Sequence, residues 1–166
     1  MASTQDGSEG LYALLVCEHE RLDGIFCQLL DALHADARED VRQLWTHFED
    51  DITTHMALEE KYIIEGLWHE GPEEARALLG EHDDIRRKLA ELSVGVELHC
   101  VSEDVVKAFV RQLRDHARRE NEHAYQWAAH FLDADVQEYL RQRLGAAESF
   151  RKNAPGLHAR RQAISA

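Results

Sequence analysis

Six side chains in this sequence have the types and the spacing of a metal-binding site: His19, His55, Glu59, His82, His116 and Glu120. Each of the four histidines stands near the middle of its own stretch of regularly spaced apolar residues. His55 and His116 each precede one of the glutamates by four residues, and residues four apart lie on one face of a helix. Two helices can therefore each direct an imidazole and a carboxylate toward the same place.

The His-x-x-x-Glu spacing is weak evidence by itself, because chance predicts about one match in a chain of this composition. Four matches are present. The two further matches begin at His69 and His99, and each spans a predicted break between helices. We therefore expect neither of them to lie on a single helix.

The elements that must position these residues are predicted to be helices. Apolar residues recur at three- and four-residue steps in four segments, at about 11–33, 36–69, 72–99 and 102–127, and a shorter fifth helix is expected over 133–147. Asp36 with Glu39 predicts a capping pair, Pro72 a first helical position and Ser102 an N-cap. The predicted fold is all-α, an antiparallel up-and-down four-helix bundle with a short C-terminal fifth helix.

The heights of the histidines in such a bundle follow from the turns. Two residues on an antiparallel helix pair lie at one level when they are equally far from the turn between them. The midpoints of successive histidines fall at positions 37, 68.5 and 99, close to the expected turns at Asp36, Gly71-Pro72 and Ser102. A one-residue error shifts a pair by about 3 Å. All four histidines are therefore expected in one layer.

Composition restricts the class of protein. The chain has 166 residues, a formal net charge of −13 and three cysteines without Cys-x-x-Cys spacing. We expect one domain over 11–148, a disordered N-terminus (1–10) and a flexible basic tail (149–166). The negative charge argues against a nucleic-acid partner. No secretory signal or membrane span is visible, and the odd number of cysteines favours a reducing, cytoplasmic location.

The chemistry of the layer favours metal ions. Burying two unpaired carboxylates on apolar stripes costs several kcal/mol, and a pair of divalent cations removes that cost. Imidazole and carboxylate without thiolate suit iron, with manganese or zinc as substitutes. Two ions bridged by carboxylate and by oxo or hydroxo groups would keep open positions for a small ligand. The alternative is that the six are ordinary polar residues in a hydrated core.

Four runs in the chain resemble the signatures of the hemerythrin-like (HHE cation-binding) domain family. They begin at Glu18 (EHERL), His55 (HMALEE), Glu81 (EHDDIR) and His116 (HARRE), and the resemblance covers about residues 10–145. It implies that the six residues named first ligate a di-iron centre.

Two positions differ from the oxygen-carrying members of that family. Arg86 stands where the carriers have a second histidine on the third helix, and Asn121 stands where they have an aspartate. Glu120, one residue earlier, takes the carboxylate role. The set is more similar to the symmetric four-His, two-Glu type of iron–sulfur-cluster repair proteins and of an iron-sensing ubiquitin-ligase subunit, so reversible oxygen transport is not expected.

Five further residues are candidates for a supporting role around the site. Asp23 and Glu60 are positioned to orient a ligand, and Tyr62 to hydrogen-bond near the metal, although ordinary packing of Tyr62 is favoured. Arg86 is predicted to extend outward or to pair with a carboxylate. His123 follows His116 by two turns and is expected to be a core residue more often than a ligand.

The sequence thus predicts a cytoplasmic di-iron protein that binds or senses a small ligand (dioxygen, nitric oxide or peroxide) or iron status, in an oxidative or nitrosative stress response. Two alternatives stay open: an enzyme that decomposes peroxide or reduces nitric oxide, and an iron donor for cluster repair. The protein partner is unknown.

Overall fold

The computed structural model describes the backbone of residues 3–152 and the side chains of residues 10–144. Every element in this range is helical: α1 (Ser3–His34), α2 (Arg38–Glu59), the π-helical turn η1 (Glu60–Ile64), α3 (Glu65–Glu70), α4 (Pro72–Glu97), α5 (Glu103–Glu122), α6 (Ala124–Phe131) and α7 (Ala134–Lys152). Within it, no helix has the length and apolar character needed to cross a membrane.

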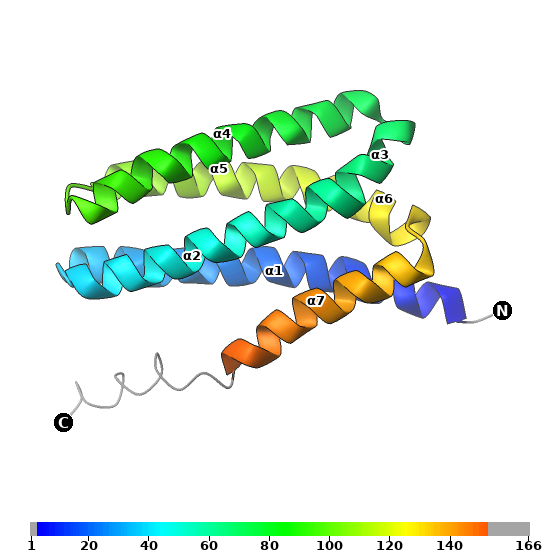
Figure 1. Cartoon of the computed structure of the whole chain (residues 1–166), viewed down its shortest axis with the longest axis horizontal. Coiled ribbons are helices and arrows are strands. Elements are labelled where there is room, and N and C mark those ends of the chain that lie inside the picture. Colours follow the sequence, from blue (N-terminus) through cyan, green and yellow to red (C-terminus); the bar gives the residue numbers. More distant parts are fainter. Residues whose placement is uncertain (1–2, 153–166) are drawn as a thin grey trace.

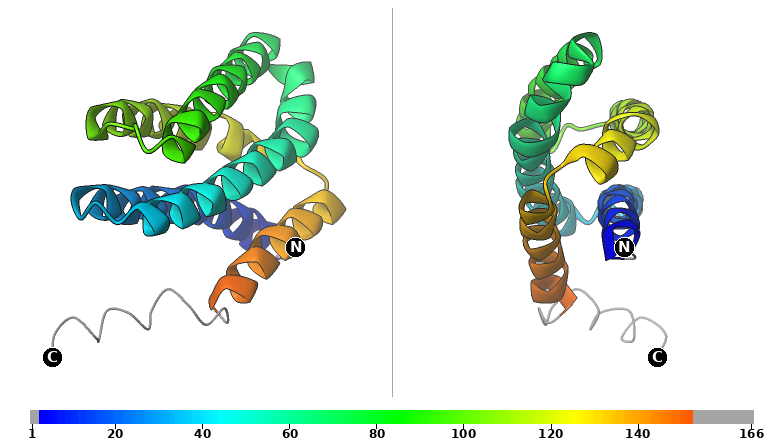
Figure 2. Two further views of the ribbon diagram at one scale, coloured as in Figure 1. Left: turned by 60° about the vertical axis from the view of Figure 1, so that its left-hand side comes forward. Right: turned by 90° about the vertical axis from the view of Figure 1, so that its right-hand side faces the viewer.

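Four long helical segments form the bundle, as the sequence predicts. The first is α1, the second is α2 continued through η1 into α3, the third is α4, and the fourth is α5 followed by α6 (Figure 1). The view along the bundle in Figure 2 places these segments at four corners. Helix α7 crosses the bundle and packs against α1 (Figure 1). The all-α bundle with a fifth helix is confirmed.

Local sequence signals explain where α4 and α5 begin. Ser102 caps α5, because its hydroxyl accepts a hydrogen bond from the Val105 backbone N–H at 3.4 Å. Pro72 occupies the first turn of α4. The predicted capping pair at the start of α2 is wrong: Ala37 precedes that helix without a side-chain cap. Asp36 instead adopts a φ of 49°, a left-handed conformation that aspartate tolerates in a turn.

The structure adds two irregularities that periodicity does not reveal. The predicted second helix contains η1, and the predicted fourth helix is interrupted at His123, whose φ of −125° and ψ of −69° are not helical. The terminal helices are longer than expected, since α1 begins at Ser3 and α7 ends at Lys152. Residues 153–166, most of the predicted basic tail, lie outside the described residues.

The apolar core is divided into two clusters. One surrounds Phe26, Phe48 and Phe109 near the turns after α1 and α4, and the other contains Leu11 and Ile64 at the opposite end. On α1 and α4 the predicted histidine stands where the apolar stripe passes from one cluster to the other, and on the second segment Glu59 stands there. The polar layer therefore lies between two buried apolar clusters, which limits access of water to it.

Candidate metal centre

The four histidines meet in the middle of the bundle as two pairs. The Nε2 atoms of His19 and His55 are 3.1 Å apart, and those of His82 and His116 are also 3.1 Å apart. The first pair joins α1 to α2, and the second joins α4 to α5. Equal distance from the turns has thus placed four residues from four helices at one height, as the sequence argument predicts.

The two glutamates connect these pairs. Glu59 Oε1 lies 3.1 Å from Nε2 of His55, and Glu59 Oε2 lies 3.6 Å from Nε2 of His82. Glu120 Oε2 lies 3.2 Å from Nε2 of His19, and Glu120 Oε1 lies 3.3 Å from Nε2 of His82. Each carboxylate therefore faces both histidine pairs.

The donor atoms form two groups that share both glutamates. One group is His19, His55, Glu59 and Glu120, and the other is Glu59, His82, His116 and Glu120. Within each group, one ligand atom from every residue lies within 4.8 Å of the others. This arrangement has the connectivity of two adjacent metal sites with two bridging carboxylates.

Burial makes the two carboxylates costly without a cation. Glu59 is 2 % exposed and Glu120 is 1 % exposed. Glu59 Oε2 is buried and accepts no hydrogen bond within the part of the chain that the structure describes, and the nearest polar atoms to the buried Glu120 Oε2 are the imidazole nitrogens of His19 and His116, at 3.2 and 3.3 Å. A buried anionic oxygen without a partner costs several kcal/mol. Metal ions bound between these residues would satisfy both oxygens, so the residues present fit such a group.

The electrostatics of the protein without metal show the same demand for positive charge. Burial lowers the pKa of His116, but its hydrogen bond with Glu120 and the negative charges of Glu120 and Glu59 outweigh burial and raise that pKa to about 9. Burial raises the pKa of Glu120, and the hydrogen bonds from His116, His19 and His82 outweigh it, holding that pKa well below its ordinary value. Against the effect of burial, the pKa values of His55 and His82 are also raised by the two glutamates, so in the metal-free protein protons on these three imidazoles balance the carboxylates.

The outer nitrogens of three imidazoles each contact a polar side chain. Nδ1 of His82 lies 2.8 Å from Glu60, Nδ1 of His116 lies 2.7 Å from Glu81, and Nδ1 of His19 lies 3.1 Å from Asn121. A partner at Nδ1 fixes the ring and directs Nε2 inward, as is usual for metal-binding histidines. Glu60 was expected to orient a ligand, whereas the contacts of Glu81 and Asn121 were missed.

Two arginines hold the outer carboxylates in place. Arg86 donates a 2.7 Å hydrogen bond to Glu60 and does not enter the cluster. Arg119 donates to Glu81 at 2.9 Å and to both oxygens of Glu74 at 2.7 and 2.8 Å. Arg86, which stands where the oxygen-carrying hemerythrins have a histidine, therefore supports Glu60, the residue that contacts Nδ1 of His82.

Three of the predicted supporting residues make their contacts elsewhere. Asp23 forms an ion pair with Arg114. Tyr62 lies over Tyr139, with ring centroids 5.2 Å apart, in the packing role that the sequence favours. His123 is exposed, and its Nδ1 hydrogen-bonds to the backbone carbonyl of residue 119.

Sequence reasoning missed Tyr125, which is 0 % exposed and lies inside the cluster. Its hydroxyl oxygen is 2.9 Å from Nε2 of His19 and 3.2 Å from Nε2 of His55, and it donates a hydrogen bond to Glu59. On an unbroken helix, nine residues after His116 correspond to about 900°, which is the opposite face. The break between α5 and α6 redirects Tyr125 toward the site, and no local signal marks that break.

Close packing between α3 and α6 supports this placement. At Gly66 an added Cβ would overlap the ring of Trp127. The absence of a side chain at Gly66 therefore lets the indole approach the α3 backbone, two residues after Tyr125.

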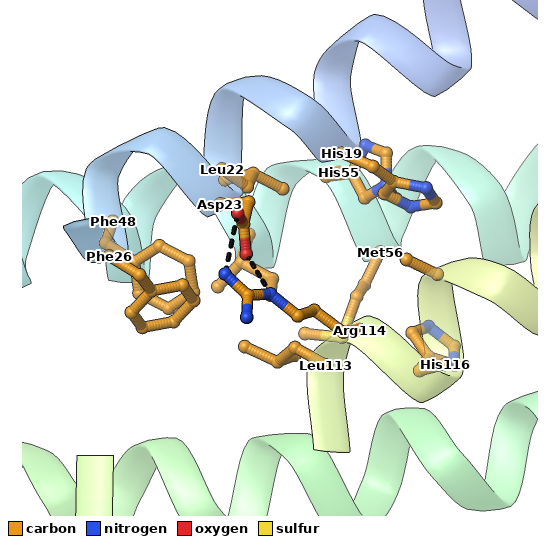
Figure 3. A pocket seen from close by; sticks show the side chains of 12 residues that line it. His19, Leu22, Asp23, Phe26, Phe48, His55, Met56, Leu113, Arg114 and His116 are labelled. Atoms are coloured by element: carbon orange, nitrogen blue, oxygen red, sulfur yellow. Dashed lines mark hydrogen bonds and ion pairs between the residues drawn. The ribbon is translucent and has the colours of Figure 1, made fainter. Parts of the chain in front are cut away.

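A small apolar pocket adjoins the cluster. It has a volume of about 50 Å³ and is lined by His19, His55 and His116 on one side and by Phe26 and Phe48 on the other. Figure 3 shows the Arg114 side chain from α5 reaching across this pocket to Asp23 on α1. The pocket therefore offers room for a molecule of a few atoms beside three of the imidazoles.

Comparison with known families agrees with this geometry. A family model described as the hemerythrin HHE cation-binding domain matches residues 10–128. Comparisons with curated proteins and with solved structures found no significant match. The matched range contains all four histidines, both glutamates and Tyr125. This chain belongs to the hemerythrin HHE cation-binding domain family.

Proposed function

We propose that the protein holds two iron ions between its four histidines and two glutamates and binds a small ligand there, namely dioxygen, nitric oxide or peroxide. Such binding would serve the sensing of oxidative or nitrosative stress, or of iron status. The observation that carries this proposal is the pair of buried carboxylates, Glu59 and Glu120, each of which lies between the two imidazole pairs.

The donor set supports iron in particular. The site offers imidazole nitrogens and carboxylate oxygens, while the three cysteines are free and exposed. Sites of this composition suit iron, with manganese and zinc as substitutes, whereas thiolate-rich sites favour structural zinc. Bound iron would supply a redox-active Lewis acid with open coordination positions. Three free cysteines also support a reducing compartment, so we propose a cytoplasmic location.

The pocket supports a small ligand. A space of about 50 Å³ is far below the roughly 300 Å³ at which pockets for larger organic molecules begin. It exceeds the roughly 10–15 Å³ of such space that a cavity needs to hold one water molecule. Its lining is mainly apolar, with Leu22, Ile52 and Met56 next to the imidazoles. A diatomic gas or peroxide fits these dimensions and this polarity.

The residues around the six ligand candidates orient the imidazoles, keep water from the carboxylates and cover the pocket. Glu60, Glu81 and Asn121 direct three imidazoles inward through contacts at Nδ1. The two apolar clusters on either side exclude water from the carboxylates. The Asp23–Arg114 ion pair lies over the pocket and restricts entry from solvent.

Metal analysis combined with ligand titration tests the proposal. Protein produced in iron-supplemented medium should contain about two irons per chain, and His82→Ala should lose them while His130→Ala, at an exposed helix position, should not. Wild-type protein without bound metal would refute the proposal. A stoichiometric, reversible spectral change with nitric oxide or peroxide supports binding and sensing. Sustained turnover would favour an enzyme, and transfer of iron to an apo cluster protein would favour a donor.

A further inference from the structure

Apart from the two shared glutamates, Tyr125 differs from the other polar side chains around the histidines in the nitrogen that it contacts. Glu60, Glu81 and Asn121 reach the outer Nδ1 atoms, which is how supporting residues contact metal-bound imidazoles. The Tyr125 hydroxyl instead lies 2.9 and 3.2 Å from the inner Nε2 atoms of His19 and His55. Its oxygen therefore lies among the donor atoms and not behind them.

The spacing of these donor atoms is that of ligands around one ion. First-row metals bind nitrogen and oxygen at about 2.1 Å, so ligands at right angles are about 3.0 Å apart. The Nε2 atoms of His19 and His55 are 3.1 Å apart, and Nε2 of His55 is 3.1 Å from Glu59. The Tyr125 oxygen has the same spacing from both imidazoles. It completes a compact group with His19, His55 and Glu59.

The opposite pair has no equivalent. Among the described side chains, Nε2 of His82 and Nε2 of His116 contact each other and the shared glutamates, with no tyrosine beside them. Both histidine pairs therefore face both glutamates, but among the described side chains a tyrosine hydroxyl lies beside the His19–His55 pair and not beside the His82–His116 pair.

We propose that the Tyr125 phenolate is a ligand of the iron held by His19 and His55, which makes the two ions unequal and leaves more open positions on the ion held by His82 and His116. Coordination exchanges the phenolic O–H bond for an iron–oxygen bond, and the proton leaves to solvent. This inference rests on the proposed di-iron site.

Optical spectroscopy of the loaded, oxidised protein tests the assignment. A phenolate bound to ferric iron absorbs visible light by charge transfer, and resonance Raman excitation in that band enhances phenolate ring vibrations. The wild-type protein should show both signals. Tyr125→Phe should lose them while keeping about two irons per chain. Tyr62→Phe is the matched control and should retain them, because Tyr62 packs against Tyr139 away from the cluster.

A second variant covers the case in which Tyr125→Phe does not fold. The chain has four tyrosines, and replacing Tyr12, Tyr62 and Tyr139 by phenylalanine leaves Tyr125 alone. The visible band should persist in that triple variant, and its disappearance would overturn the assignment. Wild-type protein with about two irons but no visible band would overturn it as well and leave the di-iron proposal intact. Wild-type protein without iron would overturn both.

Discussion

The contact between Glu81 and His116 yields a quantitative prediction about metal affinity. Glu81 Oε2 lies 2.7 Å from Nδ1 of His116, and Arg119 holds the other oxygen of that carboxylate at 2.9 Å. Partners of this kind fix the ring of a metal-binding histidine, and their loss typically weakens metal binding about 10- to 100-fold. Glu81→Ala should therefore weaken iron binding by this factor, which corresponds to about 1.4–2.7 kcal/mol.

Glu74 provides a matched control on the same helix. It also pairs with Arg119, at 2.7 and 2.8 Å, but its hydrogen-bond partner is that arginine and not an imidazole. Glu74→Ala should therefore change iron affinity little, although it removes a comparable surface charge. Iron affinity can be measured for both variants by competition with a chelator of known strength. Equal losses in the two variants would show that charge, and not support of His116, controls affinity, and would refute the reasoning.

Three further predictions concern pH, access and packing. In the metal-free protein, the pKa of His116 is raised from 6.5 to about 9, so protonation of His116 contributes to the free energy of unfolding. This contribution is fully present below pH 6.5 and is lost as pH rises through 9. Urea unfolding at pH 6.5 and pH 10 should therefore show a lower free energy of unfolding at the higher pH. Arg114→Ala removes the exposed ion pair over the pocket, so azide should bind the iron-loaded protein faster, while the free energy of unfolding changes by less than about 1 kcal/mol. Stopped-flow absorbance measures the rate of azide binding. The control variant Arg118→Ala should leave that rate unchanged. Gly66→Ala should destabilise the protein in thermal unfolding, because the overlap with Trp127 outweighs the roughly 1 kcal/mol that alanine gains in a helix.

Apolar spacing and turn signals were sufficient to predict the bundle and the common height of its histidines. The stripe on each helix passes through its histidine, and chain breaks near Asp36, Gly71-Pro72 and Ser102 set the levels. These are local properties, since helix periodicity and most helix ends depend on residues within a few turns. The six predicted ligand candidates were therefore identifiable before any contact was known.

Tertiary structure decided what surrounds those six residues. Tyr125 enters the cluster because the helix breaks at His123, which turns onto the site a residue that an unbroken helix directs away. The contacts of Glu81 and Asn121 join residues 35 and 102 positions apart in the chain. Such contacts depend on how helices rotate and approach one another, and side-chain packing between distant segments sets that geometry. Helix periodicity and turn positions indicate which residues could hold metal, and the packing of the helices sets which neighbours support them.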